Sequence, residues 1–382
     1  MGSKTSKAKR IASVDTKTVA APVVPRVPQE IVDEIMDHLA TDSDSRSLRS
    51  CSLVSKSWVP SCQRHLFHTI LFTSRDTERW VKKFPLPEQS PAHHVRDLGF
   101  SLGGYHERFF EHIPWFRNVK KMTLLEHGFQ SRWISSFGTP GRLPQCATSL
   151  ILTADTVTLL QIRDVMMQLP NLNDLSLSGS FVVTDRNTLR GIGTVLRGKF
   201  GGQLQLLRRH ANADIMNMLL EVPTGLHFTE VHIRPINESL LSTVRLAEAC
   251  DKTLVKLTYA VAIHDGREAC DRSFDFSEFP SLQEVNFGVC WIGGGLRWIP
   301  MALLTLKPAT SPRLSAVRLN FISPLSDIRS AETSAGELGN DLQRTADEVT
   351  RIRREFGGAV NVIVLRDPWF KVAFDTLQIF QH

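Results

Sequence analysis

The sequence lacks the residue spacings by which proteins usually hold metal ions. It has six cysteines, and no two of them form a C-x-x-C pair, which excludes a zinc ribbon or a dithiol redox motif. His65 and His68 lie three residues apart and His93 and His94 are adjacent, but no carboxylate or cysteine stands at ligand spacing to them. We therefore expect no metal site and no cofactor.

Long hydrophobic runs are missing as well. No apolar stretch approaches the ~18 residues that are needed to cross a bilayer. The N-terminal stretch also has no apolar segment of the kind found in secretory signals. We expect the cysteines to be reduced thiols in a cytoplasmic or nuclear protein.

The motifs of common catalytic sites are also absent. The sequence has no G-x-S-x-G elbow for a hydrolase serine. The run GTVLRGKF at 193–200 comes close to a P-loop, but Phe200 stands where that motif needs a Ser or Thr to hold magnesium. We expect that the chain is not an enzyme, and an enzyme whose pocket only a structure would reveal is the alternative.

The net positive charge is concentrated at the N-terminus. The net charge is +6, and residues 1–26 hold six of the 45 basic residues but one of the 39 acidic residues. The rest of the chain is therefore nearly neutral, and we expect no nucleic-acid partner. Residues 1–26 have almost no large apolar side chains, which predicts a disordered basic tail.

The start of this tail matches the pattern for N-myristoylation, with Gly2 after the initiator Met and Ser6 four positions later. One acyl chain binds a membrane only marginally and needs a second signal. Four nearby cations provide a polybasic signal of that kind, namely Lys4, Lys7, Lys9 and Arg10. Membrane contact is expected only through this tail; a solvated basic tail and a nuclear-import signal are the alternatives.

Residues 27–72 combine short apolar stripes with polar turns. Pro28 is predicted at the first helical position, where its missing N–H costs nothing, and Glu30 complements the helix dipole. In the polar turn TDSDSRS, Ser45 or Ser47 is predicted to cap a second helix. The first stripe consists of Ile31, Ile35, Met36 and Leu39. The second consists of Leu48, Cys51, Leu53, Val54 and Trp58, and the third of Cys62, Leu66, Phe67, Ile70 and Phe72. These spacings predict a small helical module.

The runs VPQEIVDEIMDHL and SLRSCSLVSKSWVPSCQRHLF resemble the F-box. Ten positions match its pattern in order, and Val27 stands where Leu is usual. The resemblance implies that this module docks a Skp-family adaptor and, through it, the cullin of a cullin-RING ubiquitin ligase. The contact surface that it implies consists of Val27, Pro28, Ile31, Ile35, Leu48, Leu53, Val54 and Trp58. A place in the module's own core is the alternative for several of these residues.

Beyond a predicted linker at 73–92, residues 93–382 contain a recurring pattern with apolar residues at positions 1, 4 and 6. Copies start at residues 95, 119, 147, 172, 228, 254, 282, 314 and 360. The double step between 172 and 228 predicts one degenerate unit near Leu204 and Leu207. Residues 320–357 are predicted to be an insertion.

This pattern resembles the strand segment L-x-x-L-x-L of the leucine-rich repeat, although the Asn or Cys expected after the strand is mostly missing. Positions 4 and 6 of each strand are predicted to point inward. Apolar stripes at 159–169, 240–250 and 338–356 predict returning helices. The expected fold class is α/β: a small helical F-box module followed by an irregular leucine-rich-repeat-like solenoid with a parallel sheet. An ordinary α/β domain with chance spacing is the alternative.

The two resemblances together imply a substrate-recruiting adaptor subunit of an SCF-type ubiquitin ligase. The helical module would bind the Skp-family adaptor, and the concave surface of the repeat body, residues 93–382, would bind a protein client that the sequence does not identify. The alternative is an F-box and repeat scaffold that acts outside a ubiquitin ligase.

Overall fold

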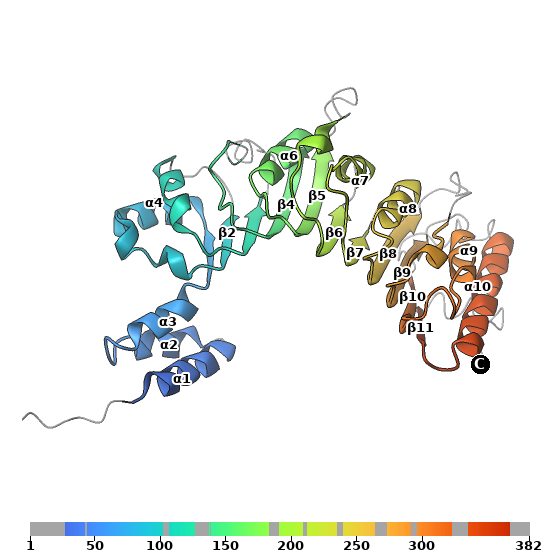
Figure 1. Ribbon diagram of the computed structural model, residues 1–382, viewed down its shortest axis with the longest axis horizontal. Helices are drawn as coiled ribbons and strands as arrows, with labels where there is room; N and C mark the ends of the chain where they lie inside the picture. Colours follow the sequence, from blue (N-terminus) through green and yellow to red (C-terminus); the bar gives the residue numbers. More distant parts are fainter. Residues whose placement is uncertain are drawn as a thin grey trace, which may run out of the picture. The chain divides into compact units, whose positions relative to one another are not determined.

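The computed structural model describes residues 27–42, 44–101, 107–126, 137, 139–182, 191–208, 212–234, 240–263, 273–291, 296–322 and 335–366. The chain forms two compact units, and the division in the sequence falls between Cys62 and Gln63 (Figure 1). We call residues 27–62 the helical unit and the described residues from 63 onward the repeat body. The predicted tail at 1–26, with Gly2, lies outside the described residues.

Two helices and the first half of a third make up the helical unit. They are α1 (Gln29–Thr41), α2 (Ser45–Cys51) and α3 (Val59–Leu66), of which α3 continues into the repeat body. Helix α1 begins one residue later than predicted, so Pro28 is the residue before the helix. The cap of α2 also differs from the prediction, because the Asp44 side chain accepts a 2.9 Å hydrogen bond from the Ser47 backbone N–H. This bond satisfies one of the unpaired N–H groups of the first turn.

The repeat body is built on one parallel sheet whose eleven strands follow each other in chain order (Figure 1). The strands are β1 (Thr69–Phe72), β2 (Asp97–Ser101), β3 (Lys121–Leu125), β4 (Ser149–Thr158), β5 (Asp174–Val182), β6 (Gln203–Arg208), β7 (Glu230–Ile233), β8 (Lys256–Ile263), β9 (Glu284–Trp291), β10 (Ala316–Ile322) and β11 (Asn361–Arg366). Each strand pairs with the next one along the chain. The body is therefore an α/β solenoid of the leucine-rich-repeat-like type.

The predicted inward positions are confirmed for eight of the nine repeat copies. Positions 4 and 6 of these copies are almost completely buried, as in the pairs Leu98 and Phe100 of β2 or Val317 and Leu319 of β10. The degenerate unit is also present as β6, but its buried residues are Leu204 and Leu206, while Leu207 is exposed. Alternation along each strand sends these side chains to one face of the sheet.

The register predicted for the last repeat copy is wrong by one residue. In β11, Val362 pairs with Val317 and Val364 with Leu319, so these two valines continue the buried columns of the sheet. Leu365, which was predicted to point inward, is exposed. In the run NVIVL, Val362 and Val364 alternate with Ile363 and Leu365, so either set could face the core. Alternation alone therefore does not choose between the two registers.

The boundary between the two units also differs from the prediction. Thr69–Phe72 is a strand that pairs with β2, so it belongs to the sheet and not to the helical module. The predicted linker is likewise part of the body, since it contains α4 (Ser74–Lys83) and two 3₁₀ helices, η1 (Pro87–Gln89) and η2 (Pro91–His94). The predicted boundary at residue 72 was based on a local stripe of apolar residues. Whether Thr69–Phe72 forms a strand depends instead on its pairing with β2, which lies further along the chain.

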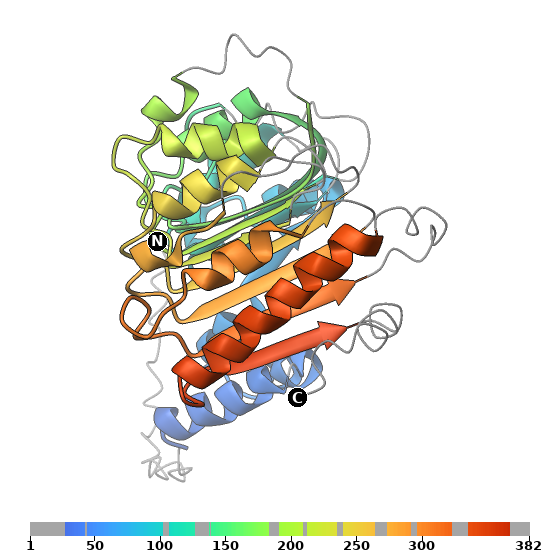
Figure 2. The ribbon, with the colours of Figure 1, turned by 90° about the vertical axis from the view of Figure 1, so that its right-hand side faces the viewer.

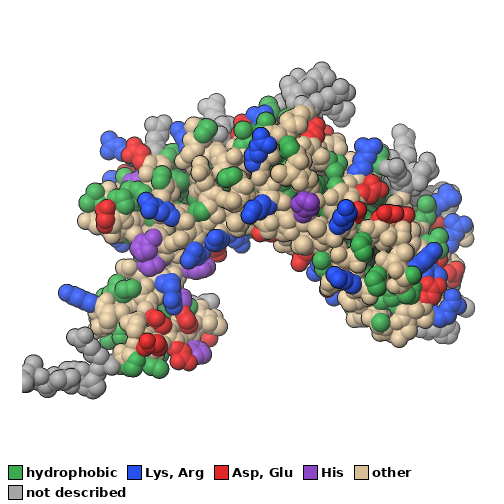
Figure 3. Space-filling view, viewed as in Figure 1, with side chains coloured by type: hydrophobic (Ala, Val, Ile, Leu, Met, Phe, Trp, Pro, Cys, Tyr) green, Lys and Arg blue, Asp and Glu red, His purple; other side chains and the backbone are tan. Residues whose placement is uncertain are grey.

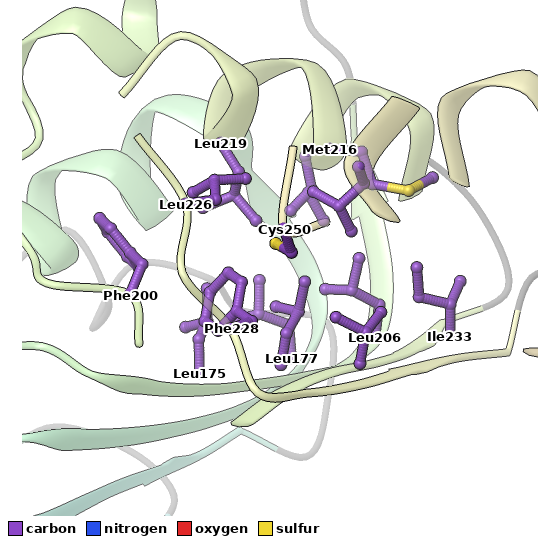
Figure 4. Close-up of a cluster of buried hydrophobic side chains, with 14 of the residues drawn as sticks. Leu175, Leu177, Phe200, Leu206, Met216, Leu219, Leu226, Phe228, Ile233 and Cys250 are labelled. Carbon is purple, nitrogen blue, oxygen red and sulfur yellow. The ribbon is translucent and has the colours of Figure 1, made fainter. Parts of the chain in front are cut away.

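Helices cover one face of the sheet (Figures 1 and 2). The predicted helices are α6 (Leu159–Met167), α8 (Leu240–Glu248) and α10 (Ala335–Glu355), and the structure adds α7 (Asn212–Leu220), α9 (Trp298–Leu304), η3 (Glu107–Trp115), η5 (Ile192–Val195) and η6 (Phe276–Glu278). Between helices and sheet lies a continuous apolar core. Figure 4 shows a part of it, where Leu177 and Leu206 from the strands face Met216 and Leu219 from α7. The other sheet face, which we call the strand face, carries the alternate residues.

Candidate docking surface on the helical unit

The helical unit has a small core made by residues from its three helices. Val32 and Met36 of α1, Leu48 of α2 and Cys62 of α3 are buried there, and the Cys62 thiol lies 3.4 Å from the Met36 sulfur. The predicted stripe along α1 is thus divided. Val32 and Met36, four residues apart, face inward, while Ile31 and Ile35 lie on another side of the helix. The four-residue spacing of Val32 and Met36 was the signal that sequence reasoning missed.

Polar side chains fix α1 against α3. The Ser61 hydroxyl donates a 2.5 Å hydrogen bond to the Asp33 carboxylate, and the Gln29 amide donates to the same carboxylate and to Ser61. Because these bonds join residues about thirty positions apart, they set how the two helices pack. At the start of α2, hydrogen bonds from Ser47 hold the pKa of the Asp44 carboxyl below its usual value.

Five large apolar side chains of this unit remain exposed. Val27, Ile31 and Ile35 are 51%, 46% and 40% exposed, and they follow one another at four-residue steps along one side of α1. Leu53 and Val54 are 88% and 67% exposed in the turn after α2. A unit of this size cannot bury all of its apolar side chains on its own. Exposed apolar side chains gathered on a small unit are typical of a surface that binds another protein.

The other residues of the predicted contact set lie in three different places. Pro28 is exposed at the start of α1, next to Val27, and Trp58 is half-buried before α3. Leu48 is buried in the core, so the structure assigns it to the packing of the unit and not to its surface. The lipidation candidate, Gly2, is among the residues that the structure does not describe.

No protein-family model matches the chain, and no curated protein matches its sequence. Among solved structures, the chain is similar to the leucine-rich repeat-containing protein LegL7 from Legionella pneumophila, with 13% sequence identity and a TM-score of 0.31. That match covers 83% of this chain and 92% of the other. The resemblance of the helical unit to the F-box stays a prediction.

The strand face of the repeat body is a second surface with a regular arrangement of polar groups. Neutral side chains hydrogen-bond from strand to strand along it: Thr153 to Ser178 at 2.8 Å, Ser176 to Gln205 at 3.3 Å and Asn286 to Thr258 at 3.2 Å. Near its C-terminal end, the Glu284 carboxylate lies 3.3 Å from the Lys256 ammonium and 3.4 Å from the Arg318 guanidinium. His232 stands in the same row as Gln205 and Thr258. Burial, followed by the nearby Arg234 and Lys256 charges, lowers its pKa.

The near P-loop of residues 193–200 has a structural role. The backbone N–H groups of Gly191 and Gly193 donate to the Glu221 carboxylate at 3.1 and 3.0 Å. A Cβ at residue 193 would lie 1.8 Å from the Met218 carbonyl oxygen, so close packing requires glycine there. Phe200 is buried in the core. Within this run, the Gly193 N–H is thus occupied by a carboxylate, and four other N–H groups donate to backbone carbonyls, those of Thr194, Leu196, Lys199 and Phe200.

Within the described part of the chain, no group of three or more His, Cys, Asp or Glu side chains is arranged to hold a metal ion. The same residues include no helix with the length and apolar character that crossing a membrane requires. Cys250 is buried against the strands in the core (Figure 4). Its burial raises the pKa of the thiol to about 12, which makes it an unreactive packing group.

Proposed function

We propose that the protein is a substrate-recruiting adaptor subunit of an SCF-type, cullin-RING ubiquitin ligase. The helical unit docks a Skp-family adaptor, and through it a cullin, while the strand face of the repeat body holds a protein client. The chain performs no covalent chemistry in this scheme, because bringing the client close to the transferring enzyme is what accelerates the reaction.

One observation carries the docking half of the proposal. Five of the eight residues that the F-box resemblance implies for contact are the large apolar side chains that the helical unit leaves exposed. Pro28, exposed beside them, adds a sixth. Burying such side chains in a partner contributes most of the binding energy of a typical interface, with aromatic and aliphatic anchors at its centre.

The client half is supported by the form of the repeat body. Its eleven strands place side chains from successive repeats in rows on one face, and solenoids use such extended surfaces to bind other macromolecules. Neutral polar side chains line this face along several repeats, where they hydrogen-bond from strand to strand.

A pull-down with a purified Skp-family adaptor tests the docking half. In one variant, Leu53→Ser and Val54→Ser remove the most exposed apolar side chains of the unit without touching its core. The matched control is Met301→Ser with Leu304→Ser, which removes two exposed apolar side chains from α9 of the body. We expect the wild-type chain and the control to retain the adaptor and the docking variant to lose at least about tenfold in affinity.

Equal binding by the docking variant and the control would contradict the assignment of this surface. If the wild-type chain does not bind the adaptor, the scaffold function outside a ubiquitin ligase becomes the better proposal. The ligase half has its own readout, which is whether a cullin is retained together with the adaptor.

A further inference from the structure

We infer that the N-terminal end of the repeat body binds a short acidic segment of a protein partner. The surface consists of four cations, Arg96, Arg117, Lys120 and Lys121, which we call the basic corner. The inference names the chemistry of the partner for the client-binding half of the function proposed above, and it does not depend on the helical unit.

Backbone pairing places the basic corner on neighbouring repeats. The Arg96 N–H donates to the His68 carbonyl at 2.9 Å, and the Lys120 N–H donates to the Arg96 carbonyl at 2.7 Å. These three residues therefore occupy the same position just before β1, β2 and β3. Adjacent strands are about 4.8 Å apart, so this row spans roughly 10 Å. Lys121 pairs with Asp97 in the next row.

Side-chain contacts keep part of the corner in place. The Arg96 guanidinium donates to the Asn118 carbonyl at 3.2 Å, and the Asn118 amide donates to the His93 carbonyl at 2.6 Å. Arg117 is the residue next to this anchored asparagine. Arg96, Arg117 and Lys120 are exposed, and Lys121 is half-buried.

The described residues provide no ion-pair partner for the cations of the corner. Asp97 is the acidic neighbour, and its carboxylate accepts a hydrogen bond from the Thr69 hydroxyl at 3.4 Å. Figure 3 shows Lys, Arg and His side chains together near the N-terminal strands of the body. Their field favours an anionic ligand, and like charges held close together become more stable once such a ligand is bound.

Further along the sheet the charge changes, and this limits the length of the anion. The row that starts with His68, Arg96 and Lys120 continues through neutral residues: Thr148, Asn173, Gly202, Thr229, Val255, Gln283 and Ser315. The adjacent row holds Asp97 and Lys121 at the corner. Beyond the corner it carries three more carboxylates, at Asp174, Glu230 and Glu284, and one cation, Lys256. A nucleic acid that extended from the corner across the successive strands would meet these carboxylates. An acidic peptide segment of about three to four extended residues, at roughly 3.3 Å each, matches the corner.

Fluorescence polarisation with the full chain and a labelled peptide of ten glutamates tests this inference. In the corner variant, Arg96→Gln and Lys120→Gln remove two exposed charges. The matched control, Lys307→Gln with Arg313→Gln, removes two exposed and unpaired cations near α9. Because the basic tail is present in every protein compared, its contribution cancels. We expect the corner variant to bind about tenfold more weakly than the control, with a smaller dependence on salt.

A second variant keeps the test independent of folding. The exchange Arg96→Lys with Lys120→Arg retains both charges and is expected to bind within about twofold of the wild type. Equal peptide binding by the corner variant and the control would overturn the inference. A second outcome would also overturn it: a single-stranded oligonucleotide of equal charge binds the wild type more tightly than the peptide does, and the corner variant loses that binding. The corner would then be a nucleic-acid site. The corner variant should retain the Skp-family adaptor as the wild type does, so failure of the docking proposal and failure of this inference give different results.

Discussion

Arg351 lies on α10, and its guanidinium reaches the last turn of α9. It donates to the Leu303 and Leu306 carbonyls at 2.8 and 3.1 Å, and it pairs with Glu348 and Glu355, both at 2.6 Å. Leu303 lies in the last turn of α9, where its carbonyl also accepts from the Leu306 N–H, and Leu306 follows the helix. The arginine side chain thus adds a donor at the end of α9, where carbonyls lack partners within the helix. This contact also fixes α10 against its neighbour.

We expect Arg351→Met to lower the free energy of unfolding of the repeat body by about 3 kcal/mol, because it removes a charged donor from the Leu303 and Leu306 carbonyls and from two carboxylates. Arg344→Met is the matched control, since Arg344 is exposed on the same helix and should change the free energy by less than about 0.5 kcal/mol. Urea unfolding measures both. A loss of similar size in the two variants would mean that the contact with α9 contributes little.

Strand β1 ties the first residues of the repeat body to the sheet. Phe72 is the buried end of this strand, and its ring lies 4.8 Å from Phe109, 5.2 Å from Trp80 and 5.8 Å from Phe100. Its neighbour Leu71 is exposed on the strand face. Two adjacent residues of one short strand thus have opposite environments, as alternation in a half-buried strand requires.

This arrangement predicts opposite results for two neighbouring substitutions. Phe72→Ala should destabilise the repeat body by about 3–5 kcal/mol, since it leaves a cavity among aromatic rings. Leu71→Ala should be nearly neutral. Thermal unfolding compares the two variants. Equal and small effects would support the boundary suggested by the sequence, with Phe72 at the end of a separate helical module.

At the scale of the whole chain, two units have separate cores. The buried side chains of the helical unit do not belong to the continuous core of the repeat body. Within the body, by contrast, each strand and helix contacts mainly its neighbours along the chain, as in other solenoids. We therefore expect the two units to differ in their opening free energies.

Met36→Ala tests this separation. Met36 is completely buried in the helical unit, and its truncation should lower the stability of that unit by about 2–5 kcal/mol. Hydrogen exchange followed by mass spectrometry should show faster exchange in peptides from 29–62 and unchanged exchange in peptides from β5 to β10. Faster exchange throughout both units would show instead that they unfold together.

The sequence by itself determined the repeat architecture of the body. Apolar residues recur at positions 4 and 6 because each strand must bury one face, so the spacing of these residues predicts where the strands lie. It also determined which helices follow β4, β7 and β10, since their stripes have the helical period. The five large apolar residues that the helical unit leaves exposed were also predicted from the sequence as contact residues, through the resemblance to the F-box.

Only the tertiary structure decided the features that depend on a distant partner. The register of β11 follows from its pairing with β10, because its own residues are apolar on both faces. Strand β1 exists because β2 is beside it, and Leu48 is buried because α2 packs against α1. The basic corner is a surface because backbone pairing stacks Arg96 on Lys120, which are 24 positions apart in the chain. Local periodicity reports which side chains avoid water, but the neighbours that they meet are set by the packing of the whole chain.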